Sequence, residues 1–133
     1  MNRKIAVRYC SKTQFSNTKR IAESIAKGAK VEAVSIKEET KLPEYVDVLF
    51  LGGAPYANIM APELRAYAES LSKEQVGEVY LFTTSNWSRR TIYALRKILR
   101  KNGIKVHTAY FYAHMLRIEK RLPAAGKFGE KAL

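Results

Sequence analysis

The sequence predicts an α/β protein in which helices cover both faces of a parallel sheet. Five apolar segments alternate with amphipathic segments along the chain, the pattern of repeated strand and helix units. The most apolar segment, residues 46–51, is nearly continuous and ends at Gly52 and Gly53, as expected for a central strand covered on both faces. The 133 residues, 47% of them hydrophobic, suit one domain with a substantial core. We therefore expect residues 1–133 to form a single doubly wound α/β domain.

The expected elements are joined by short connections. Apolar runs predict strands at residues 4–10, 31–36, 46–51, 76–82 and 104–112. Helical spacing of apolar residues predicts helices at residues 17–27, in the segment from Pro62 to Leu71, and at residues 88–102. Gly28 and Gly103 are expected to stop the first and third of these helices. Pro123 suits the start of a last helix, which Gly126 and Gly129 are expected to interrupt.

Polar loops follow the first, third and fourth predicted strands, at residues 11–18, 54–61 and 83–88. In doubly wound sheets a ligand binds outside the carboxyl ends of the strands, where the winding direction reverses. The first loop holds four hydroxyl residues and Asn17 directly before a helix, whose first N–H groups have no internal partner and carry the positive end of its dipole. This loop therefore suits either an anion, such as a phosphate, or an ordinary polar helix cap.

Positive charge is concentrated in the C-terminal part of the chain. Residues 1–78 hold 12 basic and 10 acidic side chains, a net charge of +2, whereas residues 79–133 hold 12 basic and 2 acidic ones, a net charge of +10. In the predicted helix 88–102, Arg89, Arg96 and Arg100 recur at helical spacing opposite an apolar stripe. This cationic side is either a solvated face or a contact surface for an acidic protein or a polyanion.

Other composition features narrow the function classes. No apolar run approaches the length of a membrane span, and the single cysteine, Cys10, excludes an internal disulfide and fits a reducing compartment, so we expect a cytoplasmic protein without a membrane. His107 and His114 lie among aromatic residues and are expected to be packing or rim residues. We expect no catalytic constellation and no metal site, so a cofactor would have to supply any chemistry.

The first loop and the helix after it resemble the phosphate loop of the flavodoxin family, and the resemblance extends over nearly the whole chain. The family motif is Ser or Thr, any residue, Thr, Gly, any residue, Thr, followed by a helix that carries an Ile/Leu-Ala pair. Ser11-Lys12-Thr13 matches the opening, and Thr18 with Ile21-Ala22 matches the close, with two extra residues between them. In an alternative register, residues 11–16 form the motif and the extra residues enter the start of the helix. The resemblance implies a five-stranded sheet of order 2-1-3-4-5 that binds FMN.

The other two loops are similar to the family segments that hold the flavin ring. By this resemblance, Tyr56 and Trp87 would bracket the ring, and the third loop would meet its pyrimidine edge through backbone groups. Where the family usually has glycine, this chain has Gln14, Asn58 and Asn86, of which the two Asn residues are expected to keep the left-handed backbone conformation. The cofactor-binding residues implied are Ser11, Lys12, Thr13, Gln14, Phe15, Ser16, Asn17, Thr18, Ala54, Pro55, Tyr56, Ala57, Asn58, Thr84, Ser85, Asn86 and Trp87.

The resemblance implies an FMN-binding electron carrier rather than an enzyme with its own substrate, acting as a monomer or weak dimer. Since typical family members are acidic, the basic surround here points to an acidic redox partner. We also expect Arg89 and Arg90 to make the second reduction step of a bound flavin less negative than in acidic members. The alternative is a flavin-free binding module that contacts an acidic protein or polyanion through its basic C-terminal face. Within this alternative, nucleic acid is a less favoured partner than an acidic protein, because no recognised nucleic-acid motif accompanies the basic helix.

Overall fold

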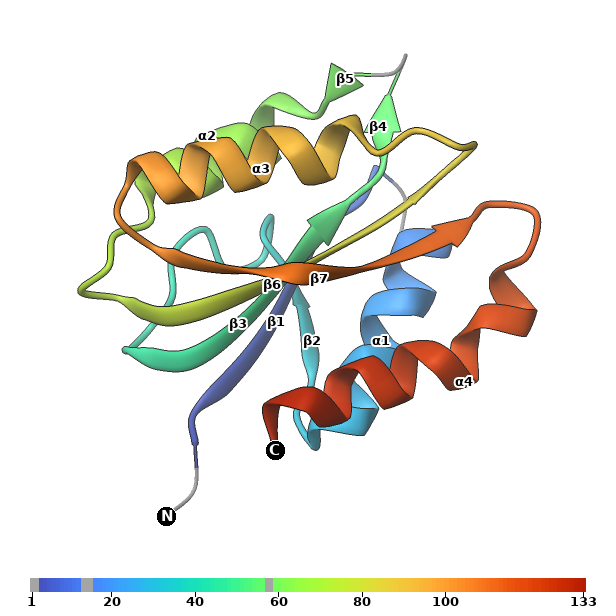
Figure 1. Ribbon diagram of the computed structural model, residues 1–133, viewed down its shortest axis with the longest axis horizontal. Coiled ribbons are helices and arrows are strands. Elements are labelled where there is room, and N and C mark those ends of the chain that lie inside the picture. Colours follow the sequence, from blue (N-terminus) through green and yellow to red (C-terminus); the bar gives the residue numbers. More distant parts are fainter. Residues whose placement is uncertain (1–2, 13–15, 57–58) are drawn as a thin grey trace.

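The computed structural model describes residues 3–12, 16–56 and 59–133, and its centre is a five-stranded parallel sheet (Figure 1). The strands are β1 (Ile5–Cys10), β2 (Ala33–Ser35), β3 (Val46–Gly53), β6 (Val76–Ser85) and β7 (Lys105–His114). Their order across the sheet is β2-β1-β3-β6-β7, and each pair of neighbours is parallel. Counted along the chain, this is the order 2-1-3-4-5, which confirms the expected topology.

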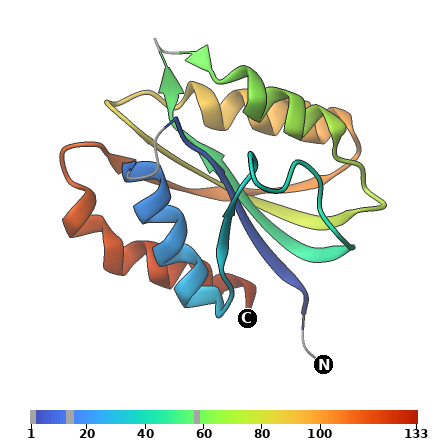
Figure 2. The ribbon, with the colours of Figure 1, turned by 180° about the vertical axis from the view of Figure 1, so that it is seen from behind.

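Helices cover both faces of the sheet, as predicted. The first pair, α1 (Asn17–Ala29) and α4 (Ile118–Gly129), lies on one face, and α2 (Pro62–Ser70) and α3 (Arg90–Lys101) lie on the other (Figures 1 and 2). A short 3-10 turn, η1 (Glu130–Ala132), ends the chain. In the described part of the chain, no helix has the length and apolar character needed to cross a membrane.

The central strand β3 divides the core into two clusters. Val48 and Phe50 pack with α1 and α4, whereas Leu49 and Leu51 pack with α2 and α3, and all four side chains have no exposed surface. On the first face, the ring of Phe50 stacks on that of Tyr80, with 5.1 Å between centroids. The continuous apolar run predicted at residues 46–51 is therefore explained by burial on both sides.

Close packing of α1 against α4 corrects the expectation for the C-terminal segment. A Cβ atom on Gly28 would lie 1.8 Å from the carbonyl oxygen of Gly126, and one on Gly129 would lie 2.0 Å from the carbonyl oxygen of Ile25. The glycines do not interrupt α4, and Pro123 lies inside it rather than at its start. Gly28 likewise lies within α1 instead of stopping it. The expectation was wrong because packing against a neighbour, rather than intrinsic propensity, stabilises these helices.

Two connections also differ from expectation. The predicted loop 54–61 contains a small antiparallel ribbon, formed by β4 (Pro55–Tyr56) and β5 (Ile59–Met60). β6 continues to Ser85, so residues 83–85 belong to the sheet rather than to the third loop, and α3 begins at Arg90 instead of residue 88. The strand extends because Thr83, Thr84 and Ser85 are buried and still pair with β7.

Arginine side chains cover the edge strand β7. The guanidinium groups of Arg96 and Arg100, both on α3, donate hydrogen bonds to the carbonyl oxygens of Thr108 and Val106, at 3.3 and 3.5 Å. From the other face, Arg121 of α4 donates to the carbonyl oxygen of Tyr112 at 3.0 Å. Three carbonyl groups of the edge strand are thus occupied by side chains of this chain.

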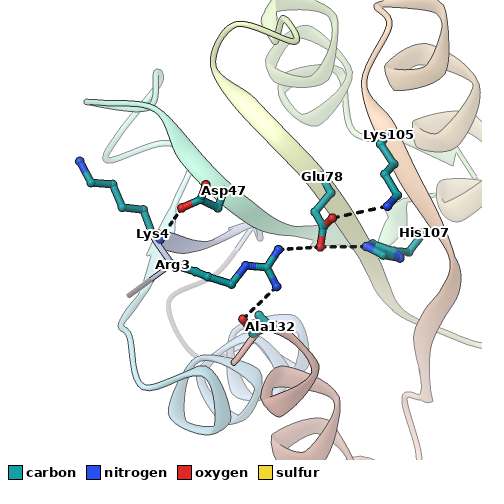
Figure 3. A network of polar contacts seen from close by, with 7 residues as sticks. All are labelled: Arg3, Lys4, Asp47, Glu78, Lys105, His107 and Ala132. Carbon is teal, nitrogen blue, oxygen red and sulfur yellow. Dashed lines mark hydrogen bonds and ion pairs between the residues drawn. The ribbon is translucent and has the colours of Figure 1, made fainter. Parts of the chain in front are cut away.

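A charged cluster lies at the amino end of the sheet (Figure 3). The carboxylate of Glu78 accepts a hydrogen bond from Arg3 at 3.0 Å, lies 3.1 Å from Nε2 of His107 and forms an ion pair with Lys105 at 3.7 Å. Burial acts to raise the pKa of Glu78, but the hydrogen bonds from His107 and Arg3 outweigh it and hold the pKa below its ordinary value. The His107 ring also stacks on Tyr80, with 3.9 Å between centroids, so this histidine has a packing role.

Candidate functional site

The fold brings the three predicted loops to one edge of the sheet, where β1, β3 and β6 end (Figure 1). A fourth segment, residues 115–117 between β7 and α4, joins them there and was not among the predicted site residues. The apolar pair Met115-Leu116, placed directly after a strand and before Arg117, was the signal in the sequence that could have indicated it. The candidate site is therefore built from four connections at the carboxyl edge.

The first connection leads from β1 into α1. Ser16 is the N-cap of α1, and its hydroxyl accepts a hydrogen bond from the backbone N–H of Lys19 at 3.1 Å. Thr18 lies inside the first turn, where its buried hydroxyl is 2.7 Å from that of Thr84. The Asn17 amide donates to the carbonyl oxygen of Met115 at 3.5 Å. Thr13, Gln14 and Phe15 lie outside the described residues, so the choice between the two motif registers stays a prediction.

The end of β6 is fixed by hydrogen bonds of its hydroxyl groups. Thr83 donates to the carbonyl oxygen of Gly53 at 2.7 Å, Thr84 is bonded to Thr18, and Ser85 donates to the carbonyl oxygen of Ser88. All three β6 residues are buried. Since their side chains are engaged within the protein, this segment offers a ligand its backbone rather than its hydroxyl groups.

Trp87 has an unusual backbone conformation, with a φ of 75°. Its N–H donates to the Tyr112 hydroxyl at 2.7 Å, and its carbonyl oxygen accepts a hydrogen bond from Arg89 at 3.3 Å. Such a conformation in a bulky residue costs on the order of 1–3 kcal/mol and persists only where the surroundings impose it. The expectation for Asn86 was therefore wrong: among the described residues of this loop, Trp87 takes the left-handed conformation. Asn58 lies outside the described residues.

The side chains of Arg89, Tyr110 and Tyr112 hold the loop that contains Trp87. The Arg89 guanidinium lies 4.0 Å from the centre of the Tyr112 ring and donates through Nε to the Tyr110 hydroxyl at 2.9 Å. The Tyr112 hydroxyl in turn donates to the carbonyl oxygen of Ser85 at 3.1 Å. Arg89 therefore acts on Trp87 through hydrogen bonds and is less free than an ordinary surface arginine.

His114 joins the third and fourth connections. Its Nδ1 accepts a hydrogen bond from the backbone N–H of Leu116 at 3.1 Å, so the neutral ring carries its proton on Nε2 and donates it to Asn86 Oδ1 at 2.7 Å. The imidazole lies 4.5 Å from the Trp87 ring, centroid to centroid. His114 is thus a rim residue that orders the loops around it.

Two hollows adjoin at Trp87. The larger, about 690 Å³, lies between the starts of α1 and α4, and the smaller, about 550 Å³, lies between Trp87 and Pro55 of the second connection. Trp87, Asn86 and Met115 line both. The smaller hollow falls within the range of about 300–1,000 Å³ that small-molecule sites occupy. The side chain of Tyr56, and Ala57 and Asn58, lie outside the described residues, so the expected pairing of Tyr56 with Trp87 stays a prediction.

Cys10 ends β1 next to this edge but is not a reactive thiol. The residue is buried, and burial raises the pKa of its thiol above the ordinary value, which keeps the group protonated near neutral pH. Within the described ranges, no three His, Cys, Asp or Glu side chains are grouped closely enough to hold a metal ion. The chemistry suited to this edge is the binding of an anion and of a flat aromatic molecule.

Comparisons with known proteins agree with this architecture. No family model and no curated protein sequence matches the chain. Among solved structures, a flavodoxin from the domain Archaea is 18% identical with a TM-score of 0.71, covering 96% of this chain and 95% of that one. A short-chain flavodoxin associated with a bacterial microcompartment is 13% identical with a TM-score of 0.70, covering 98% and 99%. Flavodoxin 2 from Bacillus cereus is 18% identical with a TM-score of 0.67, covering 96% and 99%. The protein is therefore a domain with the flavodoxin-like fold.

Proposed function

We propose that the protein binds FMN non-covalently at the carboxyl edge of its sheet and carries electrons between partner proteins. The observation that supports this most is the exposed Trp87 side chain, which lines a hollow of about 550 Å³ opposite Pro55 and also lines the larger hollow at the start of α1. The solved structures similar to this protein include flavodoxins, matched over nearly their whole length. All three predicted loops lie at the carboxyl edge of the sheet.

The residues at the start of α1 fit a phosphate group. Ser16 caps the backbone N–H of Lys19, and the first N–H groups of a helix, which have no partner within the helix, suit an anion at the positive end of its dipole. The first turn carries no acidic residue, and Lys19 and Arg20 follow directly. In the proposal, residues 11–18 hold the phosphate through these N–H groups and through hydroxyl groups of the loop.

The flavin ring would lie between Tyr56 and Trp87, with the backbone of residues 84–87 at its pyrimidine edge. The left-handed conformation of Trp87, held by Tyr112 and Arg89, keeps the indole outside the core, where it is 72% exposed and available to a flat ligand. Pro55 and Ala54 would approach from the other side. FMN supplies the reversible uptake and release of electrons, and this chain binds it, orients it and limits its contact with water.

A carrier suits the residues better than an enzyme with its own substrate. Among the described residues that line the two hollows, Glu119 is the one carboxylate, and it is paired with Arg20. No carboxylate is therefore left to act as a general acid or base there. Since the C-terminal part carries a net charge of +10, the proposed partner is an acidic redox protein. The proposed location is the cytoplasm, because the single cysteine fits a reducing compartment.

Titration of the purified protein with FMN tests the proposal, with riboflavin as the phosphate-free control. We expect FMN to quench the fluorescence of Trp87, the single tryptophan, and to bind much more tightly than riboflavin. Trp87→Ala should weaken FMN binding, whereas Tyr45→Ala, an exposed aromatic residue before β3, should leave it unchanged. Failure of both flavins to bind would overturn the proposal and favour the flavin-free binding module, whose support is the same basic C-terminal face.

A further inference from the structure

Exposed apolar side chains gather around the two hollows at the carboxyl edge. Leu116 is 84% exposed, Trp87 72%, Tyr93 56% and Met115 45%. Trp87 and Met115 line both hollows, Leu116 lines the larger one and Tyr93 the smaller one, so the four side chains form one continuous surface. Apolar side chains grouped in this way on a protein surface mark an interaction site.

The same surface is strongly cationic. Arg20, Arg117 and Lys120 line the larger hollow and Arg89 and Arg90 the smaller one, against the single carboxylate of Glu119. Arg20 and Glu119 pair with each other. The side chains of Arg90, Arg117 and Lys120 form no ion pair with any described residue, so their charges remain available.

The rest of the basic C-terminal part is less available to a partner. Arg96 and Arg100 of α3 donate into carbonyl groups of β7, as described above. Lys97 and Lys101, together with Arg65, border a separate hollow between α2 and α3 that also contains Glu69, and none of the large exposed apolar side chains of the described residues lines it. Unpaired cations and large exposed apolar side chains therefore occur together at the two hollows of the carboxyl edge.

We propose that Trp87, Tyr93, Met115 and Leu116, together with Arg90, Arg117 and Lys120, form a docking surface for a protein with an acidic surface. Tryptophan, tyrosine, methionine and arginine are the residues enriched in protein interfaces, and binding energy concentrates on such residues. The surrounding cations would attract an acidic partner over a distance and orient it. The assignment of this partner as the electron-exchange protein rests on the proposed function, but docking itself does not require flavin.

A polyanion such as nucleic acid fits this surface less well. Binding of a phosphate chain needs a track of cations, and its energy comes from phosphate contacts. Here large exposed apolar side chains, among them Leu116 and Met115, border the same hollows as the cations. Aromatic residues, methionine and arginine together are typical of a protein interface.

The soluble domain of cytochrome b5, a small acidic redox protein, is a suitable probe. We would titrate it into the isotope-labelled full chain, without FMN, and follow the backbone amide signals at about 20 mM and about 200 mM salt, a change that shortens the screening length severalfold. The expected signal changes cluster at residues 86–93 and 115–120 and weaken at the higher salt concentration.

Charge-reversal variants make the test specific. The double variant R117E/K120E should weaken binding by about tenfold, because it reverses two charges that line the same hollow as Met115 and Leu116. The matched control K97E/K101E has the same net charge but changes the separate hollow between α2 and α3, so binding should weaken by no more than about twofold. Leu116→Gln, which changes no charge, should also weaken binding.

Several outcomes would overturn the docking proposal: no binding at low salt, signal changes centred on the hollow around Lys97 and Lys101, or equal losses in the two double variants. The proposal would also be overturned if a single-stranded oligonucleotide bound more tightly than the acidic protein and changed the amide signals of the same residues. The partner would then be a polyanion. Because the titration uses the protein without flavin, its result is independent of whether FMN binds. Tight FMN binding without docking would sink this inference and leave the proposed function standing.

Discussion

The hydroxyl groups of Thr18 and Thr84 lie 2.7 Å apart and join the first turn of α1 to the end of β6. Both residues are 2% exposed, so the bond is shielded from water. Because α1 begins at the first predicted loop and β6 ends at the third, this contact fixes the distance between the two loops. The proposed phosphate and ring positions are thereby set relative to each other inside the protein.

Replacement of either threonine alone should lower the free energy of unfolding by more than half as much as replacement of both. Thr84→Val leaves the Thr18 hydroxyl buried without a partner and should lower the free energy of unfolding by about 1–3 kcal/mol, whereas the double variant T18V/T84V removes both groups and should cost less than the two single variants together. Urea unfolding measures the cycle, with the exposed Thr108→Val as control. Strict additivity would mean that the hydrogen bond is absent in solution.

The glycines between α1 and α4 should respond unequally to alanine. Gly28→Ala and Gly129→Ala place a methyl group within 2.0 Å of backbone oxygen atoms, so each should lower the free energy of unfolding by about 1–3 kcal/mol or more. Gly126→Ala is the matched control, because its nearest neighbour would be 3.6 Å away and alanine favours the helix by about 1 kcal/mol. Thermal unfolding of the three variants measures this. Equal effects at all three positions would contradict the close approach.

Two substitutions of Trp87 should separate backbone strain from the role of the ring. Trp87→Gly removes both, whereas Trp87→Ala removes the ring and keeps a side chain at a φ of 75°. We expect the glycine variant to be more stable than the alanine variant by about 1 kcal/mol, as measured by urea unfolding without FMN. Both variants should bind FMN more weakly than the unchanged protein. A more stable alanine variant would show that residue 87 has no strained backbone.

The cluster around Glu78 should make stability depend on acidity. Since hydrogen bonds from His107 and Arg3 hold the pKa of Glu78 below its ordinary value of 4.5, the native state binds this proton less readily than the unfolded state does. Its stabilising contribution is therefore present above about pH 4.5 and is lost as the pH falls through the native pKa.

Glu78→Gln should remove that part of the pH dependence, and the control is Glu44→Gln, because the Glu44 side chain is 61% exposed. The free energy of unfolding by urea, measured between neutral pH and about pH 3, gives the comparison. Equal acid sensitivity of both variants and the unchanged protein would count against the role of the Glu78 cluster.

Arg90 should influence the reduction potential of a bound flavin more strongly than cations that lie farther from the smaller hollow. Its side chain borders the smaller hollow and forms no ion pair with described residues, whereas Arg89 is held by Tyr110 and Tyr112. Two charges about 10 Å apart interact by roughly 1–2 kcal/mol at an effective dielectric constant near 20. Arg90→Glu should therefore make the second reduction step more negative, and Lys97→Glu should change it less. Spectroelectrochemical titration measures both, and equal shifts would contradict this assignment.

Much of the fold followed from the sequence because its signals are local. The continuous apolar run 46–51 predicted the central strand, and alternation of strands with amphipathic helices predicted the doubly wound sheet. Its strand order followed from the resemblance to the flavodoxin family, and the structure confirms that order. The polar loops after β1, β3 and β6 also lie at one edge, as parallel strands require.

The differences arise from contacts between residues that are distant in sequence. Gly126 and Gly129 read locally as interruptions, but α4 forms because they meet α1. Asn86 was the better local candidate for a left-handed conformation, yet Tyr112 and Arg89 impose it on Trp87. The apolar pair Met115-Leu116 directly after a strand was the one signal that residues 115–117 belong to this edge, but how near they come to Trp87 depends on how β7 pairs with β6.

The arginines that cover β7 have a consequence for how this protein meets others. With three carbonyl groups of β7 occupied and β2 only three residues long, neither edge of the sheet invites another strand. The proposed docking surface would direct contacts with a partner instead to loops and side chains at the carboxyl edge. An association built on a few side chains and steered by charge forms fast and dissociates fast, so such a surface would favour brief encounters over a lasting complex.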